Sequence, residues 1–420
     1  MTDKNNISEL IEILDRAQES KDILRSASSE QKDNALRFAA DSLDSHRDAL
    51  KVANSEDMDS ALSSDLQDSF IDRLKLNDQR IDSMISGLSK VIKLDDPVGE
   101  LTEKKSSPSG FLVSKMRVPL GVIGIIYESR PNVTADASAL CLKSGNACIL
   151  RGGSEAKNTN KEIERCMKDG LKAAGLSENS IQLLKNQDRS LVSELIKMEG
   201  KIDLIIPRGG KSLIKVISKD SRVPVLKHYE GLCHVFIDDH ADMETALEVA
   251  VNAKVYRYGI CGAMETLLVS KKMAKNILPL LKNKFDEHDV ELRGCHLTKE
   301  IIETKLALDI DWETEYLEPI LSIKVVEDID EAIMHINHFG SGHTDCIITE
   351  NENTKAKFLL EVDSSSVMHN VPTCFADGFE YGLGAEVGIS TDKLHARGPV
   401  GLEGLTSQKF VIEGTGQLRS

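Results

Sequence analysis

The stretch "IIPRGGKSLI" (residues 205–214) shows how this chain is built: an apolar run, then two glycines, then a helical pattern from about Lys211 and Ser212. A short β-branched run predicts a buried strand, and the glycine pair predicts a tight turn into a helix. The stretch "ACILRGGSEA" (147–156) repeats this order of strand, cation, glycine pair and helix start. Two such junctions in one region favour an α/β fold.

The same alternation of short apolar runs and helical patterns extends over most of the chain. Further short apolar runs occupy residues 121–128, 233–239, 265–270, 320–326 and 344–350, and helical patterns cover 155–174, 188–199, 241–253 and 271–285. Strands that alternate with helices predict largely parallel sheets. Residues 7–93 instead predict helices only, with capping-box spacing at Ser28 and Gln31. Residues 95–110 predict a connection or an exposed hairpin, because they are polar and contain proline and glycine.

Composition narrows the class of protein. A chain of 420 residues predicts two or three domains, and 40% hydrophobic with 29% charged residues is ordinary for a globular protein. The net charge of −16 argues against nucleic acid and anionic membranes as partners. No apolar run is long enough to span a membrane, and the first residues lack a secretory signal. We therefore expect a cytoplasmic protein.

The eight cysteines contain no CxxC pair, so we expect reduced thiols and no metal site; Cys295 beside His296 is interpreted as part of a surface charge cluster. Cys261 differs from the others because it lies between Gly259 and Gly262, just before an apolar run. Glycines permit a close approach to a ligand, and Arg257 is a candidate for lowering the thiol pKa. A small apolar residue in a core would give the same local pattern, so both interpretations stay open here.

The two glycine turns are candidates for holding phosphate. A strand-to-helix junction presents free backbone N–H groups and the positive end of a helix dipole, and Arg208 and Lys211 add positive charge. Two such turns favour a dinucleotide, although a tight turn without a ligand has the same sequence pattern. The stretch "GLGAEVG" (382–388) lacks a strong preceding strand, and we expect a loop there.

Three long blocks resemble the gamma-glutamyl phosphate reductase family of the aldehyde dehydrogenase superfamily: residues 118–156, 258–269 ("YGICGAMETLLV") and 382–405. The resemblance implies an aldehyde dehydrogenase-like fold with two Rossmann-like α/β domains and a small β oligomerisation element. It also implies NADPH-dependent reduction of L-glutamate 5-phosphate to L-glutamate 5-semialdehyde and phosphate, the second step of proline biosynthesis. A homo-oligomer and a functional association with glutamate 5-kinase are further implications.

The same resemblance implies roles for domains and residues. Residues 1–97 and 118–235 would bind the cofactor, residues 236–398 would form the catalytic domain, and residues 98–117 and 399–420 the oligomerisation element. Cys261 would be the nucleophile and Asn132 an oxyanion donor. The expected cofactor-binding residues are Arg151, Gly152, Gly153, Ser154, Pro207, Arg208, Gly209, Gly210, Lys211, Ser212 and Glu315.

The chain also departs from the family pattern. Tyr256, Tyr258, Ile260 and Gly262 stand where the family carries Gln, Pro, Val and Asn, and Cys374 replaces an expected arginine. We therefore expect Arg130, His395 and Arg397 to bind the substrate. His228 aligns with the water-activating glutamate of hydrolytic relatives, and Glu230 follows two residues later. The departures keep open an aldehyde dehydrogenase-like enzyme for another acyl phosphate or aldehyde. A non-catalytic relative would be expected to lose Cys261, and a cysteine hydrolase has no need of two phosphate-type turns.

Overall fold

The computed structural model describes residues 4–63, 68–227, 230–394 and 396–419. The chain forms two compact units. Unit 1 contains residues 1–227, 383–388 and 400–420, and unit 2 contains residues 228–382 and 389–399. The roles expected for the domains stay predictions.

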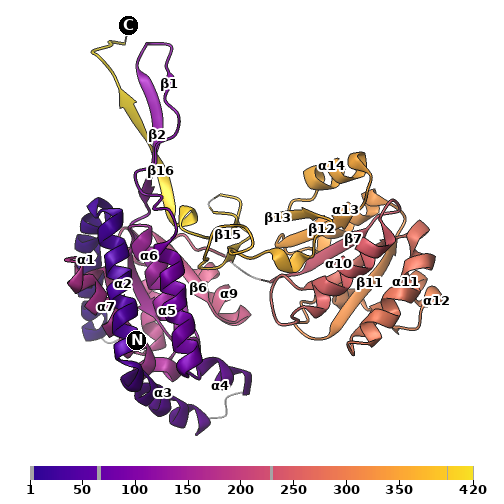
Figure 1. Ribbon diagram of the computed structural model, residues 1–420, viewed down its shortest axis with the longest axis horizontal. Helices are drawn as coiled ribbons and strands as arrows, with labels where there is room; N and C mark the ends of the chain where they lie inside the picture. The colour runs from indigo at the N-terminus through magenta and orange to yellow at the C-terminus, as the bar shows by residue number, and fades with distance from the viewer. Residues whose placement is uncertain (1–3, 64–67, 228–229, 395, 420) are drawn as a thin grey trace. The chain divides into compact units, whose positions relative to one another are not determined.

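Unit 1 begins with the predicted helices. They are α1 (Lys4–Ser26), α2 (Ser29–Ser45), α3 (Arg47–Leu62), α4 (Asp68–Leu74) and α5 (Asp78–Ile92) (Figure 1). The predicted capping box at the start of α2 is confirmed, since the Ser28 side chain accepts from the Gln31 N–H and the Gln31 side chain accepts from the Ser28 N–H. The capping box satisfies two backbone donors that a helix start leaves free.

A four-stranded parallel sheet follows the helices of unit 1. Its strands are β3 (Val122–Tyr127), β4 (Ala147–Arg151), β5 (Ile181–Leu183) and β6 (Leu204–Arg208), in the order β5-β4-β3-β6. The connecting helices are α6 (Asn132–Lys143), α7 (Lys157–Ala173) and α8 (Arg189–Leu195), and α9 (Lys211–Asp220) follows β6. Because the strands are parallel, the turns that follow β3, β4 and β6 lie at one edge of the sheet.

A second, antiparallel sheet of unit 1 joins distant parts of the chain. It has the order β1-β2-β16, with β1 (Lys105–Ser106), β2 (Leu112–Pro119) and β16 (Thr406–Glu413). The hairpin of β1 and β2 begins within residues 95–110, for which the sequence predicts a connection or an exposed hairpin. Figure 1 shows β2 and β16 extending together away from the helices of unit 1.

Unit 2 contains a seven-stranded sheet in which every neighbouring pair is parallel, in the order β10-β9-β11-β8-β7-β12-β13. The strands are β7 (Cys233–Ile237), β8 (Met264–Ser270), β9 (Glu291–Gly294), β10 (Lys305–Leu306), β11 (Ile320–Val326), β12 (Thr344–Ile348) and β13 (Ser366–His369). The helices are α10 (Met243–Val255), α11 (Lys271–Asp286), α12 (His296–Ile301), α13 (Ile329–Phe339) and α14 (Glu352–Glu361), and a two-stranded pair joins β14 (Ile389–Ser390) to β15 (Gly398–Pro399). The predicted α/β fold with parallel sheets is confirmed.

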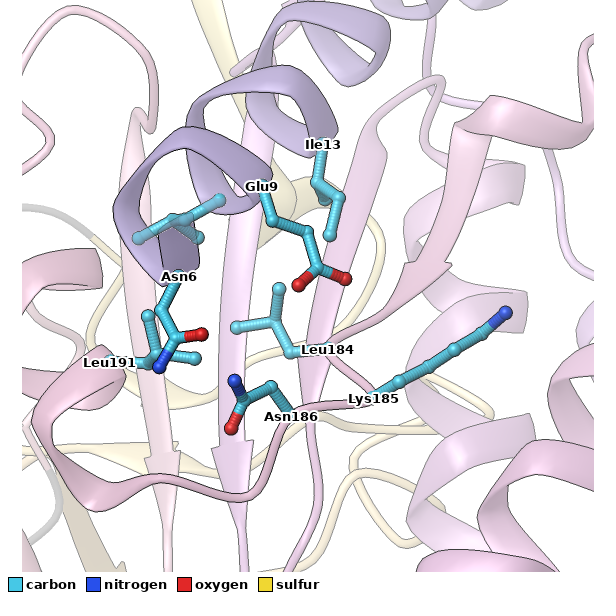
Figure 2. A pocket seen from close by; sticks show the side chains of 8 residues that line it. Asn6, Glu9, Ile13, Leu184, Lys185, Asn186 and Leu191 are labelled. Carbon is cyan, nitrogen blue, oxygen red and sulfur yellow. The ribbon is translucent and has the colours of Figure 1, made fainter. Parts of the chain in front are cut away.

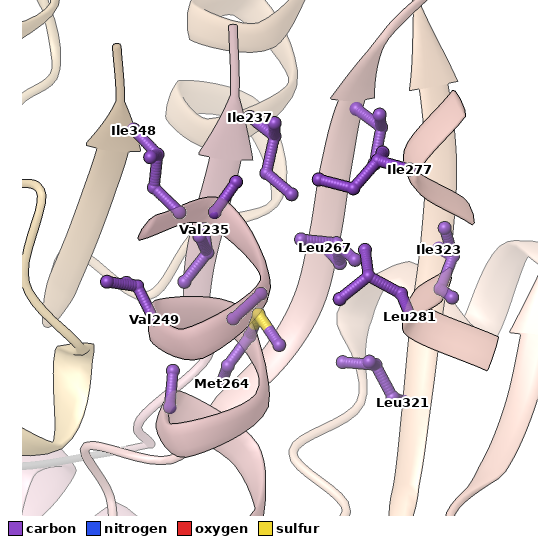
Figure 3. Packing of buried hydrophobic residues seen from close by; sticks show 14 of the residues in the cluster. Val235, Ile237, Val249, Met264, Leu267, Ile277, Leu281, Leu321, Ile323 and Ile348 are labelled. Carbon is purple, nitrogen blue, oxygen red and sulfur yellow. The ribbon is translucent and has the colours of Figure 1, made fainter. Parts of the chain in front are cut away.

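The core of unit 2 fixes the central strands. Val235 and Leu267 from β7 and β8 pack with Val249 of α10 and with Ile277 and Leu281 of α11 (Figure 3). A second cluster around Phe236, Leu268 and Phe358 packs β7 and β8 against α14. Both faces of the sheet are therefore covered, which explains why β7 and β8 are buried along their whole length and mostly apolar. Within the described residues, no helix is long and apolar enough to cross a membrane.

Candidate active site

Cys261 lies on a short connection, which we call the Cys261 turn (residues 256–263), between the end of α10 and the start of β8. The residue is partly buried, and its carbonyl oxygen accepts a hydrogen bond from Cys233 Sγ at 3.1 Å. Gly231 packs closely against the backbone of Cys261. A β-carbon on residue 231 would lie 1.8 Å from the Cys261 oxygen and 2.6 Å from the Cys261 Cα. Only glycine fits this approach, and the turn is thereby held against the start of β7.

Glu315 reaches the Cys261 turn through Gly231. One carboxylate oxygen of Glu315 accepts the Gly231 N–H at 2.8 Å. The residue predicted to bind cofactor and the residue predicted to be the nucleophile are thus joined within unit 2 by one hydrogen bond and one backbone contact. The sequence separation of 54 residues hides this proximity.

Two departures from the family pattern lie side by side. A β-carbon on Gly262 would be 3.1 Å from the Thr373 carbonyl oxygen and 3.3 Å from the Cys374 Cα. The Cys374 thiol donates to Asn252 Oδ1 at 3.5 Å, and burial raises the pKa of this thiol. The position where the family carries arginine therefore adjoins the residue that follows Cys261.

A further departure from the family pattern, Tyr258, tethers the turn. The Tyr258 hydroxyl donates to the His288 carbonyl at 3.3 Å, which connects the turn to the residues after α11. Arg257 is exposed on the same turn, and its effect on the Cys261 thiol stays a prediction. Tyr258 thus supplies a tether at the position where the family carries a stiffening proline.

Asn132 lies in unit 1 as the first residue of α6, with its side chain exposed. Its Nδ2 donates to Asp136 Oδ2 at 2.9 Å, and burial raises the pKa of Asp136 to about 6. The preceding turn is strained, because Ser129 has a φ of 34°. Glu155 holds that turn by accepting from both the N–H and the hydroxyl of Ser129 at 2.6 Å. Neither Asp136 nor Glu155 is predicted from the sequence; the four-residue spacing from Asn132 is the one local signal for Asp136.

The first glycine turn presents a cation at the end of β4. Arg151 is buried, and its guanidinium donates to the carbonyl oxygens of Gly152 at 2.5 Å and Gln187 at 3.0 Å. Its Nε is buried and has no hydrogen-bond partner among the described residues. Burial lowers the pKa of Arg151. A buried guanidinium with an unused donor fits a site that receives an anion or a ribose hydroxyl. Gly153 and Ser154 begin the short 3₁₀ turn that leads into α7.

The second glycine turn leads into helix α9, whose first residues have no side-chain cap. Gly210 is the N-cap of α9, no side chain caps the helix, and its first turn contains no acidic residue. Pro207 and Arg208 end β6, and the Gly210 N–H donates to Glu128 Oε2 at 2.9 Å. The N–H groups that follow, with Arg208, fit a dinucleotide diphosphate. The side chain of Lys211 lies outside the described residues, and Ser212 is exposed in the first turn of α9.

The predicted substrate-binding residues that the structure describes belong to different units. Arg130 is exposed beside Asn132 in unit 1. Arg397, in unit 2, donates to both the carboxylate and the carbonyl oxygen of Asp363, at 2.9 Å each. His395 and His228 lie outside the described residues. Arg397 is therefore committed to an ion pair within unit 2, whereas Arg130 stands with the oxyanion candidate.

A small surface pocket lies elsewhere in unit 1 (Figure 2). Residues of α1 and of the segment after β5 line it: Asn6, Glu9, Leu10, Ile13, Leu184, Lys185, Asn186 and Leu191. None of them is a predicted site residue. The pocket is thus separate from the two glycine turns, although Gln187, which binds Arg151, follows its rim.

Comparison with known proteins places the chain in a family. The model of the aldehyde dehydrogenase family matches residues 2–295. Gamma-glutamyl phosphate reductase from Thermotoga maritima is 45% identical, with 98% of this chain and 100% of that chain covered and a TM-score of 0.96. The Saccharomyces cerevisiae enzyme of the same name is 33% identical, with coverages of 97% and 98% and a TM-score of 0.54.

More distant structures share the fold alone. Glyceraldehyde-3-phosphate dehydrogenase from Methanocaldococcus jannaschii, solved with NADP, is 18% identical, with coverages of 96% and 94% and a TM-score of 0.67. Aldehyde dehydrogenases use NAD(P), in line with the dinucleotide predicted from the two glycine turns. The chain therefore belongs to the aldehyde dehydrogenase family and, within it, to the gamma-glutamyl phosphate reductases.

Proposed function

We propose that this protein reduces L-glutamate 5-phosphate to L-glutamate 5-semialdehyde and phosphate, with NADPH as hydride donor and Cys261 as nucleophile. The observation that carries the proposal is the Cys261 turn itself. The turn carries a partly buried cysteine whose backbone packs against Gly231, and the Gly231 N–H binds Glu315. The 45% identity to a gamma-glutamyl phosphate reductase over nearly the whole chain supports this substrate.

In the first step the Cys261 thiolate attacks the carbonyl carbon of the acyl phosphate. The carbonyl oxygen becomes negatively charged, and we assign its stabilisation to the Asn132 amide and the Cys261 backbone N–H. One such donor contributes about 3 kcal/mol to transition-state stabilisation. The C–O bond to phosphate then breaks, inorganic phosphate leaves, and a thioester remains on Cys261.

When bound, the nicotinamide would supply the hydride that reduces the thioester carbon in the second step. The same oxyanion donors hold the resulting alkoxide, which collapses with cleavage of the C–S bond to give the aldehyde and the Cys261 thiolate. No water is needed in this sequence, so reduction requires no general base beside the thioester. Glu315 would orient the nicotinamide ribose.

The cofactor assignment rests on the donors of unit 1. Arg151, with Gly152, Gly153 and Ser154, would hold the adenosine ribose, and residues 207–212 would hold the diphosphate. The positive charge of Arg151 favours a 2′-phosphate and hence NADPH over NADH. Arg130, His395 and Arg397 would bind the substrate's carboxylate and phosphate.

Assembly is part of the proposal. Residues 1–97 and 118–235 would bind cofactor, residues 236–398 would carry the chemistry, and residues 98–117 and 399–420 would join subunits of a homo-oligomer. An acyl phosphate hydrolyses readily, so association with the glutamate 5-kinase that supplies it would shorten its time in water. Co-sedimentation of the two enzymes tests that association, and separate sedimentation at high concentration would refute it.

The decisive experiment is the reverse reaction, because the semialdehyde is easier to handle than the acyl phosphate. We expect oxidation of glutamate semialdehyde that needs both NADP and phosphate, and that is lost in Cys261→Ala. NADPH binding, followed by its fluorescence, should stay near normal in that variant. Retained turnover in Cys261→Ala would remove Cys261 from the mechanism, and turnover without phosphate would indicate a hydrolytic enzyme.

A further inference from the structure

We propose that the buried Lys254–Glu265 ion pair is a positioning pair, which closes the base of the Cys261 turn and fixes the Glu315 segment against it. The inference rests on the proposed function for the roles of Cys261 and Glu315. Neither Lys254 nor Glu265 was singled out by sequence analysis. A charged residue inside the apolar run "METLLVS" was the available signal.

The pair spans the two ends of the Cys261 turn. Lys254 lies in the last turn of α10, and Glu265 is the second residue of β8. Their side chains are completely buried, and Lys254 Nζ is 2.6 Å from Glu265 Oε2. One charge-assisted hydrogen bond therefore joins the residues that flank the Cys261 turn on its two sides.

The second oxygen of Glu265 reaches the Glu315 segment. Glu265 Oε1 accepts the Leu317 N–H at 3.0 Å. Leu317 has a φ of 55°, in the left-handed region that a branched side chain rarely adopts. Such a conformation persists only where its surroundings hold it, and the Glu265 carboxylate is one group that does so.

The contacts form a closed loop of interactions. Glu315, two residues before Leu317, accepts the Gly231 N–H, and Gly231 packs on the Cys261 backbone. The chain of contacts thus runs from Lys254 through Glu265, Leu317, Glu315 and Gly231 back to the turn. Loss of the acceptor at position 265 would leave the Leu317 N–H without its hydrogen bond. Glu315 would then no longer be held in place against Gly231.

Energetics favour a positioning role over a purely stabilising one. Burial raises the pKa of Glu265 to about 7 and lowers that of Lys254, so both charges are held at a cost. Replacement of a buried ion pair by well-packed apolar residues is often neutral or stabilising. A pair that connects the predicted nucleophile Cys261 with the predicted cofactor-binding residue Glu315 is explained by the placement it enforces.

The experiment compares two double variants of similar volume. Lys254→Met/Glu265→Leu removes both charges and the acceptor for Leu317. Lys254→Met/Glu265→Gln also removes both charges but keeps an oxygen that can accept the Leu317 N–H, and it buries an amide donor without a partner. The glutamine variant should therefore be the less stable of the two, although it should hold the Glu315 segment in place better.

Three readouts separate position from stability: the thermal unfolding midpoint, hydrogen exchange at the Leu317 and Gly231 amides, and the NADPH dissociation constant from fluorescence. In the leucine variant we expect both amides to exchange about tenfold faster and NADPH to bind about tenfold more weakly, as for one lost hydrogen bond. The glutamine variant should stay near wild type in both, despite its lower midpoint.

The matched control is the Lys32–Asp96 pair of unit 1, which has the same design. Lys32 is completely buried, its Nζ is 2.5 Å from Asp96 Oδ2, and Asp96 Oδ1 accepts the Val98 N–H. Lys32→Met/Asp96→Leu should leave the Leu317 and Gly231 amides unchanged. If exchange and NADPH affinity instead follow the unfolding midpoint across all variants, the pair is only structural. Hydrogen exchange needs no substrate, so an inactive wild type would refute the proposed function and leave this test intact.

Discussion

At the scale of single residues, Asp136 orients the side-chain amide of Asn132, which is the proposed oxyanion donor. Its carboxylate accepts from Asn132 Nδ2, and burial raises its pKa to about 6. Above that pH the carboxylate is charged and orients the amide strongly, whereas below it the proton weakens the interaction. The Asn132 amide is therefore held best at neutral and alkaline pH.

We expect kcat/KM to fall as the pH drops through about 6, and Asp136→Asn to lose this limb because its acceptor does not titrate. The two enzymes differ only at position 136, so the ratio of their pH profiles isolates the effect of Asp136. A ratio that is flat from pH 5 to pH 8 would contradict this role.

The same carboxyl group should make stability depend on pH. Its folded pKa lies above the ordinary value of 3.8, so the native state binds the proton more tightly than the unfolded state. The free energy of unfolding should therefore decrease as the pH rises from about 4 to about 6, and level off above that. Urea unfolding of wild type and Asp136→Asn measures the difference, and an increase over this window would show the opposite sign.

Cys374 and Gly262 form the second contact of interest at this scale. Cys374→Arg restores the family's residue beside the Cys261 turn and should lower the KM for L-glutamate 5-phosphate, if the position meets an anionic group of the substrate. Cys374→Gln, similar in reach but neutral, is the control. An unchanged KM in the arginine variant would exclude a substrate contact there.

Gly262→Asn should be costly by itself. Its β-carbon would lie 3.1 Å from the Thr373 oxygen, so the neighbouring backbone must give slightly, and overpacking that this small movement does not relieve costs about 1–3 kcal/mol. Because Cys374 adjoins Gly262, the two substitutions should be coupled in a double-mutant cycle of unfolding free energies. Additive effects would mean that the two positions do not share this contact.

At the scale of elements, the start of β7 supports the Cys261 turn. Gly231→Ala would place a methyl group 1.8 Å from the Cys261 oxygen, and either β7 or the turn must then move. We expect a loss of at least about 3 kcal/mol in stability and a large loss of activity. Cys233→Ala removes the thiol donor to the same oxygen without an overlap and should be milder. Equal effects of the two variants would argue against the close approach as the cause.

At the scale of the whole molecule, β16 is the open edge of the three-stranded sheet. Phe410 and Ile412 are 67% and 61% exposed on one face of this strand. Exposed apolar side chains on an edge strand favour pairing with another chain. Light scattering should show an oligomer that dissociates in Phe410→Glu/Ile412→Glu. Lys409→Glu, which alters the other face of the strand, should not dissociate it, and a monomeric wild type would refute this role for β16.

The sequence by itself determined the parallel α/β fold, the strands at β3, β4, β6, β7, β8, β11 and β12, and the family with its candidate nucleophile. These features are local: β-branched runs, glycine turns and helix caps act over a few residues, and a motif such as "YGICGAMETLLV" is contiguous.

Only the tertiary structure decided which residues meet around Cys261. Gly231, Glu315, Glu265 and Cys374 come from separate elements, and their contacts depend on β8 pairing with β7 and β11 in one register. The short strands β9, β10 and β13 likewise give little local pattern, because their position depends on neighbouring strands. Such contacts follow from strand order and from packing on both faces of the sheet, which no periodicity in the sequence encodes.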